Sequence, residues 1–83
     1  MNLEPIQFRV TEKDFCEMAV GNKKEILVQE KFIFQKGDII SITSDDDSMF
    51  FRITFVDFVK IINPPPQLQE YFIQILSLQE YKE

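Results

Sequence analysis

Apolar and polar residues alternate along several short segments of this chain, which is the pattern of β-strands that bury one face. In the first segment, residues 6–10, Ile, Phe and Val alternate with Gln and Arg. Residues 25–29 contain a continuous Ile-Leu-Val run, which is typical of a buried strand. Altogether the pattern predicts five strands, over residues 6–10, 25–29, 39–43, 49–62 and 71–78.

A short helix is predicted between the first two strands, over residues 11–20. Thr11 is followed by acidic residues, a sequence that satisfies the free N–H groups of a first helical turn and complements the helix dipole. Phe15 and Met18 are spaced to share one face of this helix. Gly21 stands where a left-handed residue commonly ends a helix.

The centre of the chain is predicted to form a β-hairpin. Residues 36–38 (Lys-Gly-Asp) are a turn signal before one strand, and residues 44–48 are expected to form the tip. The returning strand, 49–62, is long, and its alternation fails at residues 56–58, where a bulge is predicted. The Asn-Pro-Pro-Pro run at 63–66 is expected to be a stiff connector, because proline cannot donate a backbone hydrogen bond.

The side chains that face inward follow from the same alternation. Cys16, on the helix, is expected to be a small buried core residue and therefore chemically inert. The charged residues 79–83 are expected to form a fraying tail. The residues predicted to form one core are Ile40, Ile42, Phe51, Ile53, Phe55, Ile73 and Ile75, with Phe15 and Met18 packed over them.

The order of elements, one helix among five strands, predicts an α+β fold built on a small, strongly bent β-sheet or a partly open β-barrel, with the helix near the N-terminus. The 83 residues suffice for a single small domain covering 1–83. The core of so short a chain is thin, and nine Phe and two Tyr supply much of its volume.

Composition excludes several classes of chemistry. The chain has no His, one Cys and two Gly, so it lacks a Ser-His or Cys-His catalytic pair, the usual zinc ligands and a glycine-rich phosphate loop. We therefore expect a binding protein rather than an enzyme, with no cofactor and no metal. No apolar stretch is long enough to span a membrane, and no signal peptide is recognisable, so we expect a cytoplasmic protein without membrane association.

Three segments together resemble the ASCH/PUA-like superfamily of small β-barrels. Residues 20–25 (Val-Gly-Asn-Lys-Lys-Glu) are similar to the turn that follows the family's helix, although the Glu stands one place early and no Arg follows it. Residues 34–42 resemble the family's Phe-x-x-Gly-Asp strand, and 68–78 its closing strand. The resemblance covers residues 6–78, and it implies a cleft for RNA or a nucleotide between the helix and the barrel.

Two functional hypotheses follow. The first is an RNA- or nucleotide-binding module in which cations form one cleft; the alternative for the lysines after the helix is a simple response to the helix dipole. The second is a small acidic interaction module or inhibitor that binds a basic protein surface, because the net charge is −5. The cations assigned to the first hypothesis are Lys23, Lys24, Arg9, Lys31 and Lys36.

Two acidic features are given structural explanations. The Asp45-Asp46-Asp47 run lacks the glycine and later glutamate of an EF-hand loop, so we interpret it as a solvated hairpin tip. Asp57 interrupts an aromatic strand, where a buried carboxylate would be a functional signal. We interpret it as a surface residue that the predicted bulge turns outward.

Overall fold

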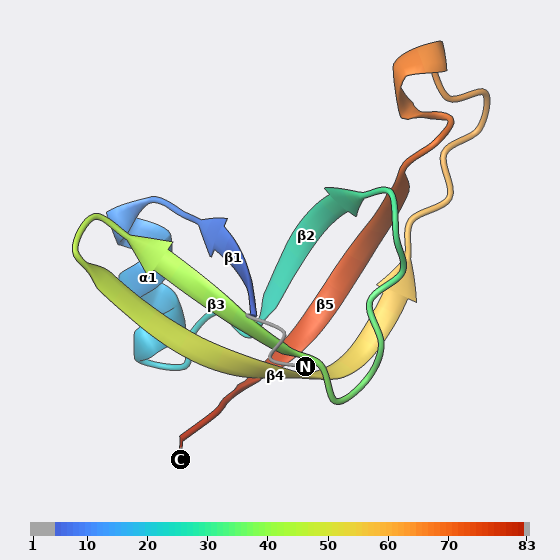
Figure 1. The fold of residues 1–83 in the computed structure, drawn as a ribbon. Coiled ribbons are helices and arrows are strands. Elements are labelled where there is room, and N and C mark those ends of the chain that lie inside the picture. The colour runs from blue at the N-terminus through green and yellow to red at the C-terminus, as the bar shows by residue number, and fades with distance from the viewer. Residues whose placement is uncertain (1–4, 83) are drawn as a thin grey trace.

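The computed structural model describes residues 5–82, which form one helix and one five-stranded mixed sheet (Figure 1). The elements are β1 (Ile6–Arg9), α1 (Glu12–Ala19), β2 (Glu25–Glu30), β3 (Ile39–Ser44), β4 (Asp47–Phe58), a 3-10 turn (Pro66–Leu68) and β5 (Phe72–Glu80). The strand order is β1-β3-β4-β5-β2, with β1 parallel to β3 and the other pairs antiparallel. The sheet curls into a half-barrel, which confirms the predicted α+β fold.

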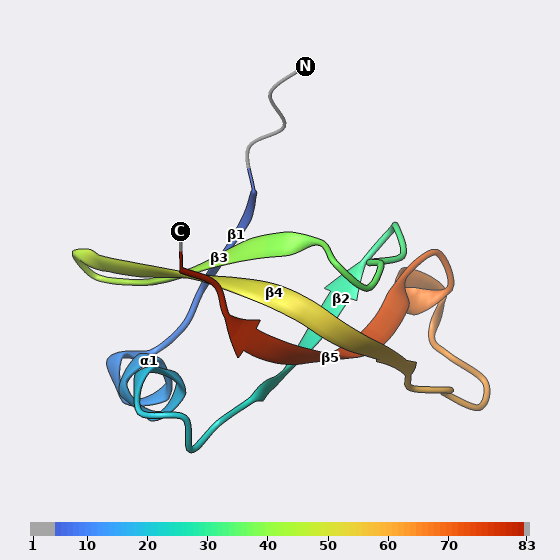
Figure 2. The same cartoon turned by 90° about the horizontal axis from the view of Figure 1, so that it is seen from below.

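The helix begins and ends at the signals in the sequence. The side chain of Thr11 accepts a hydrogen bond of 3.1 Å from the backbone N–H of Asp14. At the other end, Gly21 has a φ of 83°, and the N–H of Asn22 donates to the carbonyl of Glu17 at 2.9 Å. This left-handed glycine and the bond that spans it form a Schellman ending. Figure 2 shows the helix on one side of the sheet, beside the β3–β4 hairpin.

Strand β4 belongs to both halves of the sheet, because its first half pairs with β3 and its second half with β5. The register shifts between Ile53 and Phe55, so the bulge predicted at 56–58 lies earlier than expected. The shift reverses the side-chain phase. Ile53 is fully buried, whereas Phe55 is 60% exposed, and its assignment to the core was wrong.

The core lies between the helix and the curled sheet. Its buried apolar members are Met18, Ile26, Val28, Phe34, Ile40, Ile42, Phe51, Ile53, Leu76 and Leu78, and Phe15 packs partly buried against them. The predicted phase of the last strand was wrong: Leu76 and Leu78 point inward, and Ile73 and Ile75 stand half-buried on the opposite face. The strand starts at Phe72 and reaches Glu80, so residues 79 and 80 are ordered strand rather than tail; Glu83 lies outside the described residues.

A single glutamine ties the segment between β2 and β3 to the core. Gln74 is fully buried on β5. Its Oε1 accepts a hydrogen bond of 2.8 Å from the N–H of Phe34, and its Nε2 donates to the carbonyl of Phe32 at 2.9 Å. Both ends of the amide are therefore satisfied, as a buried polar group requires. The ring centres of Phe34 and of Phe8 on β1 lie 5.8 Å apart.

The thiol of Cys16 is exposed, contrary to the expectation of a buried residue. The helix is only eight residues long and turns Met18 and Phe15 toward the sheet, which leaves Cys16 on its solvent side.

We expect a bulky aromatic disulfide reagent to label native Cys16 within about a factor of ten of the rate in denaturant, because exposure governs access. A native rate slower by about a thousandfold would contradict the exposed position. Release of the coloured thiolate measures both rates.

Candidate functional site

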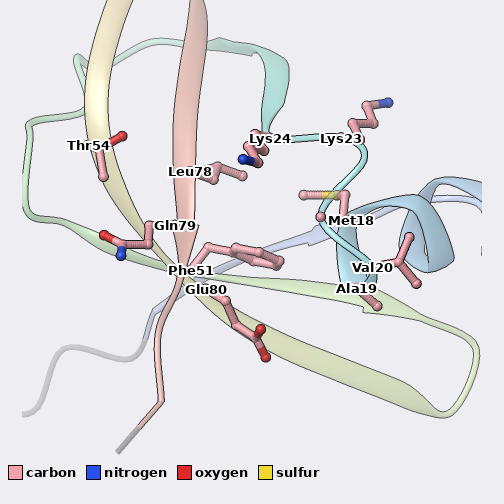
Figure 3. Close-up of a pocket in the computed structure, with 11 residues that line it drawn as sticks. Met18, Ala19, Val20, Lys23, Lys24, Phe51, Thr54, Leu78, Gln79 and Glu80 are labelled. Atoms are coloured by element: carbon pink, nitrogen blue, oxygen red, sulfur yellow. The ribbon is translucent and has the colours of Figure 1, made fainter.

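A cleft of about 550 Å³ opens between the end of α1 and strands β4 and β5 (Figure 3). Its size falls within the ~300–1,000 Å³ typical of small-molecule sites. The helix end, the segment leading into β2, and the two strands all contribute to its wall. The lining residues are 18–21, 23 and 24, 51 and 54, and 78–80.

The cleft has an apolar floor and polar ends. Phe51 and Leu78 are buried core residues that also line the cleft. Figure 3 shows Lys24 beside Leu78 at one end and Glu80 beyond Phe51 at the other. A bound molecule is thus offered a cation and a carboxylate on opposite sides of an apolar surface.

The two lysines of the cleft are placed by the helix ending. The N–H of Lys23 donates to the carbonyl of Glu17 at 3.1 Å, and the carbonyl of Lys24 accepts from Leu78 on β5 at 2.8 Å. The ammonium of Lys23 lies 3.3 Å from a carboxylate oxygen of Asp14, with both side chains 41% exposed. Among residues 5–82, no carboxylate lies within 4.0 Å of the ammonium of Lys24. Lys24 is therefore the cation best placed to meet an anion.

The other cations assigned from the sequence do not line this cleft. Arg9 lies 3.7 Å from Asp45 at the hairpin tip. Lys31 lies 3.6 Å from Glu70, with its ammonium 5.4 Å from the ring centre of Tyr71. Lys36 is exposed in the segment between β2 and β3. The five cations are thus distributed over several parts of the molecule rather than gathered in one cleft.

No family model matches the chain, and no curated protein matches it.

The described residues contain no helix long and apolar enough to cross a membrane. Within the same part of the chain, no group of three or more His, Cys, Asp or Glu side chains is arranged to hold a metal ion. Asp45, Asp46 and Asp47 are all exposed at the hairpin, whose turn consists of the two residues between Ser44 and Asp47. Asp57 is exposed as well, and its Oδ1 accepts a hydrogen bond from the N–H of Phe58.

A second, smaller hollow of about 360 Å³ lies between β1, β3 and the segment before β3. Its lining consists mainly of apolar side chains, including Ile6, Phe32 and Phe34, and among the described residues Asp38 is the one charged residue in it. A hollow with this lining offers no cation to a phosphate. The cleft beside the helix is therefore the stronger candidate for an anionic ligand.

Sequence reasoning identified Lys23 and Lys24 but missed the rest of the cleft. Phe51 was assigned to the core alone, and Glu80 to a fraying tail. The register that brings Phe51 opposite Glu80 depends on the pairing of β4 with β5, which are separated by the proline connector. The one signal available in the sequence was the alternation of Leu76, Ser77, Leu78 and Gln79, which carries the strand pattern one residue beyond Leu78, toward Glu80.

Proposed function

We propose that this protein is a non-enzymatic, PUA-like binding module that holds one nucleotide, free or within single-stranded RNA, in the cleft beside α1. The observation that carries the proposal is the pairing of an apolar floor with Lys24, whose ammonium has no carboxylate within 4.0 Å among the described residues. A base is flat and apolar on its faces and suits the floor of Phe51 and Leu78. The attached phosphate then lies toward Lys24 and Lys23.

The distribution of charge favours a small ligand over a long polyanion track. The protein carries a net charge of −5, and the cleft itself contains Glu80. Long tracks along a nucleic-acid backbone require many cations in line. Lys31 and Lys36 lie outside the cleft, so the phosphate contacts of a bound nucleotide are limited to Lys23 and Lys24. Asp14 gives up its ion pair with Lys23 at small cost, because exposed pairs contribute little.

Replacing both cleft lysines, Lys23→Glu and Lys24→Glu, is expected to weaken binding by at least about a hundredfold, because two charged contacts are lost and repulsion is added. The probes are a nucleoside monophosphate mixture and a labelled single-stranded RNA of mixed sequence, titrated at about 50 mM salt, where screening is weak. Equal affinity for both probes identifies a free nucleotide as the ligand. Binding of the oligonucleotide alone identifies RNA.

The matched control is Lys31→Glu with Lys36→Glu, which changes the net charge equally but leaves the cleft intact. It is expected to reduce affinity by less than about threefold at higher salt, where long-range charge effects are screened. With two phosphate contacts, the logarithm of RNA affinity should fall against the logarithm of salt with a slope of about −1.4, not the roughly −3.5 of five contacts. Failure of both probes to bind wild-type protein at low salt would refute the proposal.

A further inference from the structure

Strands β2, β5 and β4 carry apolar side chains on the face that points away from the core. We call this the outer face and define it by Leu27, Phe55, Ile73, Ile75, Glu25 and Asp57. Leu27 lies directly opposite Ile75, which in turn lies opposite Asp57 on β4. In the neighbouring row, Glu25 and Phe55 lie on either side of Ser77. Residues two apart on a strand share a face, so these rows form one surface.

Two of the four apolar side chains of the outer face are open to solvent to an unusual degree for strand residues, and the other two, Ile73 and Ile75, are half-buried. Leu27 is 67% exposed and Phe55 60% exposed, although each stands in the body of its strand. The prediction that residues 25–29 form a buried strand was wrong for Leu27, because β2 alternates between buried and exposed positions. Contiguous exposed apolar surface with a polar rim marks an interaction site.

The charged groups of the outer face are acidic and available. Among the residues that the structure describes, no lysine or arginine nitrogen lies within 4.0 Å of the carboxylates of Glu25 and Asp57. Two cations lie along these strands, and both are engaged elsewhere. Lys31, directly after β2, lies 3.6 Å from Glu70. Arg52, opposite Gln79 on β5, has its guanidinium 5.1 Å from the ring centre of Tyr81. The outer face therefore combines apolar area with negative charge.

We propose that the outer face binds a segment of another protein that carries both apolar and lysine or arginine side chains. The apolar residues supply the contact area, and the partner's cations meet Glu25 and Asp57. A second copy of this chain fits less well, because a two-fold interface brings the same patch against itself and so sets its carboxylates near one another. This surface is separate from the cleft, since none of its defining residues lines the cleft.

The test is selection of peptides from a random display library on the immobilised protein, followed by affinity measurements on the enriched peptides. The chain contains no Trp, so a tryptophan added to each peptide gives a fluorescence signal free of background. Enriched peptides are expected to combine apolar residues with Lys or Arg. The double change Leu27→Ser and Phe55→Ser should weaken them by at least about tenfold, as loss of central apolar contacts does. Glu25→Gln with Asp57→Asn should weaken them by about threefold or more.

The control is Ile62→Ser, because Ile62 is 84% exposed but lies between β4 and the proline connector, outside the residues that define the outer face. It should leave peptide affinity unchanged. Equal affinity of the enriched peptides for wild type and Leu27→Ser/Phe55→Ser overturns the proposal, as does enrichment of acidic or uncharged peptides or of none. Sedimentation of the wild type alone provides a further check: a dimer abolished by Leu27→Ser/Phe55→Ser would make a second copy the occupant and overturn the proposal too.

Discussion

Replacing Leu76 with alanine is expected to lower the free energy of unfolding by about 2–5 kcal/mol, the usual cost of deleting a buried leucine side chain. Leu76 is fully buried in the core, and its neighbours across the two adjacent strands are Ile26 and Val56. Alanine at this position leaves a cavity and removes contacts with side chains on both adjacent strands. Because small domains are stable by about 5–15 kcal/mol in total, this single change removes a large share.

The matched control for Leu76→Ala is Leu27→Ala, which deletes the same atoms from a side chain that is 67% exposed. Its expected cost is below about 1 kcal/mol, because little apolar surface returns to water. Urea unfolding followed by circular dichroism measures both, with the midpoint reporting stability and the slope reporting compactness. Equal costs for the two leucines would show that the inward and outward faces of the sheet have been assigned incorrectly.

Replacing Gln74 with glutamate is expected to destabilise the protein at neutral pH by about 3–5 kcal/mol, because it places an uncompensated charge in the core. The glutamate retains the acceptor for the N–H of Phe34 but, when ionised, has no hydrogen to donate to the carbonyl of Phe32. When protonated, it has a hydroxyl able to make that bond. The two protonation states of the glutamate therefore differ by one proton, and both have nearly the same shape as the glutamine.

The destabilisation should depend on pH with a definite sign. Burial and the hydrogen bond to Phe32 both favour the protonated form, so the pKa of the introduced carboxyl is raised in the folded state above about 4.3, its value in an unfolded chain. Below about pH 4.3 the group is neutral in both states, and the loss relative to wild type is small. As the pH rises above that value, ionisation stabilises the unfolded chain, and the loss grows until the folded pKa is reached.

The measurement is the difference in unfolding free energy between Gln74→Glu and wild type at a series of pH values. Taking the difference removes the response of the native carboxylates. Gln74→Leu is the control, because it loses both hydrogen bonds of the amide without adding a titrating group. Its difference from wild type should be constant over the same range. A Gln74→Glu difference that does not change between about pH 4 and pH 7 would contradict the buried position of this side chain.

The sequence was sufficient to predict the elements whose signals are local. Thr11 and Gly21 mark the two ends of the helix by their own backbone chemistry, and the structure confirms both positions. The bent sheet with one helix was also predicted correctly. The helix ends and the individual strands depend on residues close together in the chain, so predicting them required no knowledge of which strands pair.

The errors concern side-chain phase, which depends on pairing between distant strands. Phe55 continues the alternation of Phe51 and Ile53 in the sequence, and only the register shift against β5 turns it outward. In β5, apolar residues occur on both faces, so Ile75 and Leu76 are equally plausible inward residues from sequence alone. The polar Gln74 suggested an outward face, yet its amide is buried because Phe32 and Phe34 supply partners.

The candidate site was predictable in one part only. The helix ending placed Lys23 and Lys24 together, and the structure brings both to the cleft. The separate positions of Arg9, Lys31 and Lys36 depend on how the sheet curls. Composition and residue spacing do not predict this curvature. Predicting that Glu80, Phe51 and Leu78 also line the cleft would have required knowledge of the register between β4 and β5.

The composition of the cleft wall has a thermodynamic consequence. Its residues come from the end of α1, the approach to β2, the middle of β4 and the end of β5, so they range from position 18 to position 80. Unfolding any one of these elements removes part of the wall. A molecule that binds there binds the folded chain alone and therefore shifts the unfolding equilibrium of the entire domain, by an amount that grows with its free concentration. A ligand of this cleft thus reveals itself as a rise in melting temperature, even before its chemical identity is known.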